Sequence, residues 1–150
     1  MRRLQFDQDG ETLDFLCTAM RKLDLFASLS DEQLRKMLYF VKLVEFDEGE
    51  VVFEKGASGD AFYVIWAGAV QAFVSGFFGG TKVLRTMGPG DFFGELALLL
   101  RQPRSASIGC VEATQCFVLD TGDFELLMER NPDIADVIKA AARERFNNPG

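Results

Sequence analysis

Between residues 43 and 119 the chain is a series of short apolar runs, and this pattern constrains the fold more than any other feature. The runs are rich in β-branched and aromatic residues, and turn residues such as those at 47–49, 55–60 and 88–90 separate them. Short strands with turn signals at such regular spacing are typical of a β-sandwich or barrel. The sequence predicts strands at residues 43–46, 51–53, 61–66, 70–74, 82–87, 105–109 and 115–119.

Helical periodicity is found on both sides of this β-rich region. Before it, apolar residues recur every three or four positions over residues 13–23, which predicts one amphipathic helix. Ser30 and Gln33 have the spacing of a capping box and predict the start of a second helix. After it, Thr121 is expected to cap a third helix and Pro132 to occupy the first position of a fourth. The predicted layout is one α+β domain: helices, a compact β-roll, then two helices.

The composition narrows the classes of partner. The 150 residues suffice for one domain with its own core, and they carry a formal net charge of −7 with a pI near 4.6. Such a surface repels phosphate backbones, so nucleic-acid binding is not expected. Three widely spaced cysteines predict buried free thiols in a reducing compartment. No apolar run approaches the roughly 18 residues of a membrane span. A cytoplasmic location is expected, including that of the cytoplasmic domain of a membrane protein.

The inventory of reactive groups argues against catalysis. The sequence contains no histidine, which removes the commonest general base and metal ligand. No nucleophile motif is present. Glu95 is the one acidic residue expected near a cleft, and it has no acidic partner there for acid–base catalysis. Without a histidine or clustered cysteines, the sequence has no ligands for a haem or an iron–sulfur cluster. The chain is therefore expected to be no enzyme and to hold no metal and no cofactor.

The most informative segment runs from residue 92 to residue 107. Gly94 allows the backbone to come close to a ligand, and the residues after it can form a short helix whose free N–H groups would bind an anion. Arg104 can bring a guanidinium to the same place, Ser105 adds a hydroxyl, and Glu95 offers a carboxylate that could accept from a sugar hydroxyl. For an isolated arginine, a solvated ion pair on an exposed loop would be the simpler interpretation.

This segment resembles the phosphate-binding cassette of cyclic-nucleotide-binding domains. The cassette pattern is close to Phe-Gly-Glu-Leu-Ala-Leu, a short variable loop, and then Pro-Arg-Ser/Thr/Ala-Ala-Thr/Ser. Without a gap, the matching residues are Gly94, Glu95, Leu96, Ala97, Leu98, Pro103, Arg104, Ser105, Ala106 and Ser107. The resemblance implies an eight-stranded antiparallel, jelly-roll-like β-roll with N-terminal helices, a short cassette helix and two C-terminal helices. It also implies boundaries: an N-terminal helical segment at 1–24, the domain at 25–146 and a tail at 147–150.

The resemblance also implies a ligand and a role for each site residue. The ligand is a 3′,5′-cyclic nucleotide whose phosphate pairs with the arginine and whose ribose 2′-hydroxyl bonds to the glutamate. The base lies against apolar residues of the β-roll and under a lid from the last helix. The implied contacts are Gly94, Leu96, Ala97, Arg104 and Ser105 for the phosphate, Glu95 for the ribose, Val83 and Leu84 for the base, and Arg145 or Phe146 for the lid.

The end of the chain, from residue 132 to residue 145, resembles the last helix of bacterial cyclic-nucleotide-gated potassium channels. This likeness implies a regulatory domain that prefers cAMP to cGMP and passes binding through its C-terminal helices to an effector. The effector would be a channel or another domain of a longer parent protein, and a homo-oligomer is compatible with this interpretation. The glycine-rich hairpin tip at 75–80 departs from the shortest channel domains.

Two other functions stay open at this point. A relative of the same fold that has lost its ligand would serve as an interaction or dimerisation module, although intact Glu95 and Arg104 argue against that loss. A transcription regulator of the same superfamily would need a helix-turn-helix after the last helix.

Overall fold

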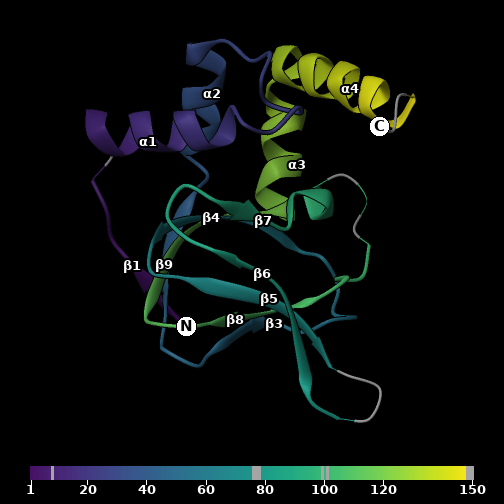
Figure 1. Cartoon of the computed structure of the whole chain (residues 1–150). Coiled ribbons are helices and arrows are strands. Elements are labelled where there is room, and N and C mark those ends of the chain that lie inside the picture. The colour runs from purple at the N-terminus through teal and green to yellow at the C-terminus, as the bar shows by residue number, and fades with distance from the viewer. Residues whose placement is uncertain (8, 76–78, 99, 101, 148–150) are drawn as a thin grey trace.

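The structure is a computed structural model that describes residues 1–7, 9–75, 79–98, 100 and 102–147, with the backbone alone at Leu96 and at 145–147. Helices α1 to α4 gather at one end of the molecule, and two β-sheets form the other end (Figure 1). Residues 76–78, in the hairpin tip noted above, lie outside the described residues. Of the described helices, none is long and apolar enough to cross a membrane.

The strands of the described residues form two antiparallel sheets, which confirms the predicted β-roll. One sheet has the order β1-β2-β9-β4-β7 and the other the order β3-β8-β5-β6. The strands are β1 (Arg2–Leu4), β2 (Lys42–Phe46), β3 (Val51–Phe53), β4 (Ala61–Ala67), β5 (Val70–Ser75), β6 (Thr81–Met87), β7 (Phe92–Phe93), β8 (Ser107–Cys110) and β9 (Thr114–Asp120).

Two details of the strand prediction were wrong. The described residues hold nine strands, whereas seven runs were predicted and the resemblance implied eight, because β1, in a segment expected to be helical, and β7, in the cassette segment, were not predicted. Strand β1 pairs with β2, and an ion pair joins Arg2 to Glu45. The strand predicted at 105–109 begins later, at Ser107, because Arg104 and Ser105 belong to the loop that precedes it.

The helices lie close to their predicted places. They are α1 (Gly10–Met20), α2 (Asp31–Leu38), α3 (Thr121–Arg130), α4 (Pro132–Asn147) and the short 3₁₀ helix η1 (Glu95–Leu98). The prediction that Thr121 caps α3 was wrong, because Asp120 is the N-cap residue and makes no capping bond with its side chain. The carboxylate of Asp120 instead accepts a hydrogen bond from Lys42 at 2.7 Å, which ties the start of α3 to β2.

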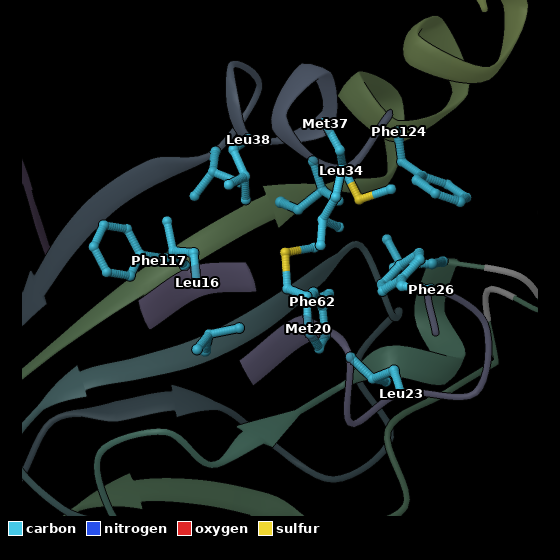
Figure 2. Close-up of a cluster of buried hydrophobic side chains, with 14 of the residues drawn as sticks. Leu16, Met20, Leu23, Phe26, Leu34, Met37, Leu38, Phe62, Phe117 and Phe124 are labelled. Carbon is cyan, nitrogen blue, oxygen red and sulfur yellow. The ribbon is translucent and has the colours of Figure 1, made fainter. Parts of the chain in front are cut away.

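Strand β4 separates two apolar cores and is buried on both faces. Phe62 and Val64 face the helices, whereas Tyr63 and Ile65 face the interior of the roll. This double burial explains why the strand is a continuous apolar run and does not alternate with polar residues. Figure 2 shows the helical core, in which side chains of α1, α2 and α3 surround Phe62 and reach Phe117 of β9. The helices are thereby fixed to the sheet that also carries β7.

The capping box predicted for α2 is present and has a third partner. Ser30 Oγ accepts from the backbone N–H of Gln33 at 3.1 Å, and Gln33 Oε1 accepts from the backbone N–H of Ser30 at 3.0 Å. The amide nitrogen of Gln33 donates to Asp133 at 3.0 Å, at the start of α4. The cap of one helix thus holds the first turn of another.

Replacing Ser30 with alanine should lower the free energy of unfolding by about 1 kcal/mol, because a helix-capping bond is lost. Urea denaturation of the variant measures this effect. Ser28→Ala, at an exposed serine outside any helix, is the control and should change the stability by less than about 0.5 kcal/mol. Equal unfolding midpoints for the two variants would contradict the cap's role.

Candidate functional site

A glycine in the left-handed region leads from β7 into η1. Gly94 has φ +83°, a value that side-chain-bearing residues rarely adopt. A Cβ atom at this position would lie 2.7 Å from Nη1 of Arg104 and 2.9 Å from the carbonyl oxygen of Ala61. The missing side chain therefore makes room for a guanidinium against the backbone.

Arg104 occupies that space and is only 7% exposed. Its Nη2 donates a hydrogen bond to the carbonyl of Ala61 at 2.8 Å, and its guanidinium carbon lies 4.1 Å from the centroid of the Phe53 ring. The Nε atom is buried and has no acceptor among the described residues. Buried donors in proteins are nearly always paired, so this N–H is a position suited to an oxygen of a ligand.

The backbone of Arg104 is fixed by the turn that precedes β4. Its N–H donates to the carbonyl of Ala57 and its carbonyl accepts from the N–H of Gly56, each at 2.8 Å. An isolated bridge between Ser58 and Pro103 extends this pairing. The glycine-containing turn at 55–60 therefore holds the loop on which the arginine stands.

The charge on Arg104 is kept and is only weakly neutralised. Burial lowers the pKa of Arg104, while interactions with Tyr63 and Asp60 raise it, and arginine stays protonated at neutral pH. The carboxylate of Asp60 lies 3.7 Å from Nη2, but its side chain is 83% exposed and solvent weakens such a pair. Burial raises the pKa of Tyr63 to about 12, so Tyr63 is neutral beside the guanidinium.

This arrangement is suited to bind an anion. The cation is buried, its position is fixed, and one of its donors is unpaired among the described residues. The part of the chain that the structure describes contains no cluster of three or more histidine, cysteine, aspartate or glutamate residues that could hold a metal ion.

The structure brings some predicted site residues together. Gly94 contacts the guanidinium of Arg104, and Ala97 follows in η1, where it is buried and its N–H donates to the carbonyl of Gly94 at 3.1 Å. Glu95 is half-buried at the first position of η1, and Ser105 is exposed directly after the arginine. Leu96 is the second residue of η1 and its side chain lies outside the described part.

The predicted base and lid residues lie on other elements. Val83 and Leu84 stand on β6, at the edge of the second sheet, and are 47% and 50% exposed. A register shift opposite them leaves Leu84 without a paired residue, so only Val83 faces a partner, Phe73. Arg145 and Phe146 belong to the last turn of α4, and their side chains lie outside the described residues. The structure does not test these contacts.

Sequence reasoning missed one residue at the candidate site and one exposed residue in the same row of paired strands. Phe53 was read only as part of a strand, yet its ring lies under the guanidinium. Arg85 of β6 pairs with Ala72, a buried residue of the roll's interior, so the register places Arg85 on the inner face of its sheet. The available signal for Arg85 was a charged residue within the predicted strand at 82–87.

The comparison with known families agrees with this geometry. A model of the cyclic nucleotide-binding domain matches residues 43–131, which run from β2 to the end of α3 and include the whole site. This chain belongs to the cyclic nucleotide-binding domain family. The matched range contains the cassette segment at 92–107, so the resemblance noted there is confirmed. The family is regulatory and not catalytic.

Known members of the family share this fold and much of the sequence. A cAMP-dependent protein kinase regulatory subunit of Mycosarcoma maydis is 38% identical over 71% of this chain, and a protein of Rhodopseudomonas palustris named for a potassium channel is 32% identical over 83%. The chain spans 23% and 30% of their lengths. The regulatory domain of Toxoplasma gondii PKA, crystallised with cAMP, has a TM-score of 0.75 and 26% identity, and the match covers 93% of this chain and 50% of that one.

Gly94→Ala should destabilise the cyclic nucleotide-binding domain by about 1–3 kcal/mol more than Gly90→Ala. Both glycines have a positive φ, so both variants carry the same backbone strain. At Gly90 the nearest atom to an added Cβ is Lys22 Nζ at 3.8 Å, so only the Gly94 variant adds a clash. Urea denaturation measures the difference, and equal losses would show that the guanidinium does not need this space.

Proposed function

We propose that this domain binds a 3′,5′-cyclic nucleotide and passes binding to an effector through its C-terminal helices. Arg104 binds the exocyclic oxygens of the phosphate, together with the backbone amides of Leu96 and Ala97, with Gly94 giving access and Ser105 adding its hydroxyl. The Ala97 N–H donates to the carbonyl of Gly94 in the unliganded chain, so it exchanges that acceptor for the phosphate on binding. Glu95 accepts a hydrogen bond from the ribose 2′-hydroxyl.

The single observation that carries this proposal is the buried and only weakly neutralised guanidinium of Arg104. Burying an ion costs several kcal/mol unless it is paired and hydrogen-bonded, and here the buried Nε–H has no acceptor among the described residues. The chain as a whole is acidic, so an anion would be attracted here locally and not by the general field. A half-buried carboxylate at the start of the adjoining turn suits a ligand that also carries hydroxyl groups.

Contacts at the start of α3 support transmission from the cassette to the C-terminal helices. The hydroxyl of Thr121 donates to the carbonyl of Ala97 at 3.5 Å, and its backbone N–H donates to the carbonyl of Asp60 at 2.9 Å. Movement of η1 on ligand binding would therefore act directly on the first turn of α3. The result is a population shift between two arrangements of the C-terminal helices, with Arg145 or Phe146 closing over the base.

The wider setting follows from the same proposal. The effector is a channel or another domain of a longer parent protein, and the domain is cytoplasmic. The domain itself spans residues 25–146, after an N-terminal helical segment at 1–24 and before a tail at 147–150. We propose cAMP as the preferred ligand, on the resemblance of the last helix to that of the channel domains.

The proposal is tested by calorimetric titration of the full chain with cAMP and with cGMP, after any co-purified ligand has been removed. The wild-type chain should bind, and Arg104→Ala should weaken binding roughly 30-fold to several-thousand-fold, because removal of one partner of a buried charge contact costs about 2–5 kcal/mol. Arg35→Ala, at an exposed arginine of α2, is the matched control and should bind like the wild type.

The opposite result is equally informative. A folded, ligand-free sample that gives no heat and no chemical-shift change with either nucleotide would sink the proposal. The alternative of a ligand-free interaction or dimerisation module would then explain the fold better.

One observation favours cGMP as the second candidate ligand. Arg85 is exposed at the edge of its sheet, and its register opposite Ala72 assigns it to the inner face. It stands in the paired row that crosses Ala72 and Ile108 and ends at Phe53 under the guanidinium of Arg104. An arginine offers donors only, which match the two acceptors O6 and N7 of guanine but only one acceptor, N7, of adenine.

If Arg85 reads the base, Arg85→Ala should weaken cGMP binding about 5- to 150-fold and leave cAMP binding within about threefold, as one lost bidentate base contact costs about 1–3 kcal/mol. The ratio of the two dissociation constants, measured in the wild type and the variant, decides the point. An unchanged ratio would show that Arg85 does not read the base.

A further inference from the structure

The guanidinium of Arg104 is held on its face by an aromatic ring. Its central carbon lies 4.1 Å from the centroid of Phe53 and 6.0 Å from that of Tyr63. Both distances are within the range of cation–π attraction, and the shorter one is well inside it. Because Arg104 is only 7% exposed, water competes little with this contact.

Phe53 is itself fixed by two further rings. Tyr63 of β4 and Phe93 of β7 are stacked with their centroids 4.8 Å apart and their planes at 10°. The Phe53 ring is tilted against both, at 5.9 Å from each centroid. The ring under the arginine therefore belongs to a platform built from both sheets, and it has little freedom to follow a moving side chain.

A β-bulge directs Phe53 toward the arginine. In the pairing of β3 with β8, Val51 is opposite Gly109 whereas Phe53 is opposite Ile108, so the register shifts by one residue between them. Val51 is 42% exposed, and Ile108 is buried in the interior of the roll. In a regular strand Val51 and Phe53 would share one face. The bulge instead places Phe53 on the inner face, which is a known use of such irregularities.

The ring and one carbonyl define the orientation of the guanidinium. The carbonyl of Ala61 accepts in the guanidinium plane from Nη2, and the Phe53 ring covers one face. Neither contact neutralises the positive charge, and neither uses Nε, which has no acceptor among the described residues. The two contacts thus fix the fork while its remaining donors stay directed to an incoming anion.

We propose that Phe53 is a positioning residue that pre-orients Arg104 for the phosphate of the ligand. This inference rests on the proposed function and deepens it, because it assigns part of the affinity to a residue outside the cassette. Without the ring, the guanidinium has more conformational freedom in the unliganded chain. Binding must then order it, and affinity falls by the cost of that ordering.

The test compares Phe53→Leu and Phe53→Tyr in calorimetric titrations of the full chain with cAMP and cGMP. Leucine keeps an apolar side chain but removes the ring face, so the affinity should fall about three- to thirtyfold. Tyrosine keeps the ring and should restore binding to within about threefold of the wild type. Phe15→Leu is the matched control, because the Phe15 ring packs on Trp66 in the helical core and should not affect affinity.

A third variant separates the electrostatic role of the ring from its packing volume. Pentafluorophenylalanine at position 53 keeps the shape of the ring but reverses the charge of its face. The inference predicts that this variant binds as weakly as Phe53→Leu. Wild-type affinity in the fluorinated variant would overturn the inference, as would wild-type affinity in a folded Phe53→Leu chain.

These experiments distinguish a failure of the proposed nucleotide binding from a failure of the proposed role of Phe53. If the wild-type chain binds neither nucleotide, the proposed function fails and the inference fails with it. If the wild type binds, Arg104→Ala does not, and the Phe53 variants all bind like the wild type, the inference alone is wrong.

Discussion

The burial of one positive charge organises this domain. A guanidinium that is 7% exposed would be costly in an apolar environment, and a single carbonyl bond and an exposed carboxylate at 3.7 Å offset only part of that cost. The shape of the surrounding structure further offsets the cost of burying the charge. Gly94 removes a side chain from its path, and the ring of Phe53 offers a negative face to its charge. The Nε–H has no acceptor among the described residues, and under the proposed function the phosphate of the ligand supplies one.

The same residue connects the site to the rest of the fold. The loop that carries Arg104 pairs with the turn at 55–60, whose last residue, Asp60, accepts a backbone hydrogen bond from Thr121 at the start of α3. The hydroxyl of Thr121 reaches η1 at Ala97, and Lys42 joins β2 to Asp120 and Asp123 of the same turn of the chain. A few hydrogen bonds therefore connect the cassette to the first turn of α3. Such a connection suits a domain that is proposed to regulate an effector.

Sequence reasoning found the fold and the cassette because both leave local signals. Short apolar runs and turn residues located seven strands, and the Ser30–Gln33 spacing located a helix start whose capping bonds the structure confirms. It missed β1 and β7, whose three and two residues become strands only through pairing with β2 and β4. It also misplaced the cap of α3, where Asp120 takes the N-cap position and its carboxylate binds Lys42. The position of Phe53 could not be read from the sequence either, since a bulge between β3 and β8 determines which face it occupies. These failures share a cause: each depends on a partner distant in the chain.

The central claim is that Arg104 is the cation that binds the ligand's phosphate, and its own Nε–H group reports this most directly. The measurement is the ¹H–¹⁵N spectrum of arginine side chains in the full chain, with the Arg104 signal assigned by its loss in Arg104→Lys. On saturation with a cyclic nucleotide, the account predicts that this signal moves downfield and that its hydrogen exchange slows, because the buried donor gains an acceptor. A ligand that shifts the backbone amides of η1 but leaves the Nε–H signal unchanged would contradict the account.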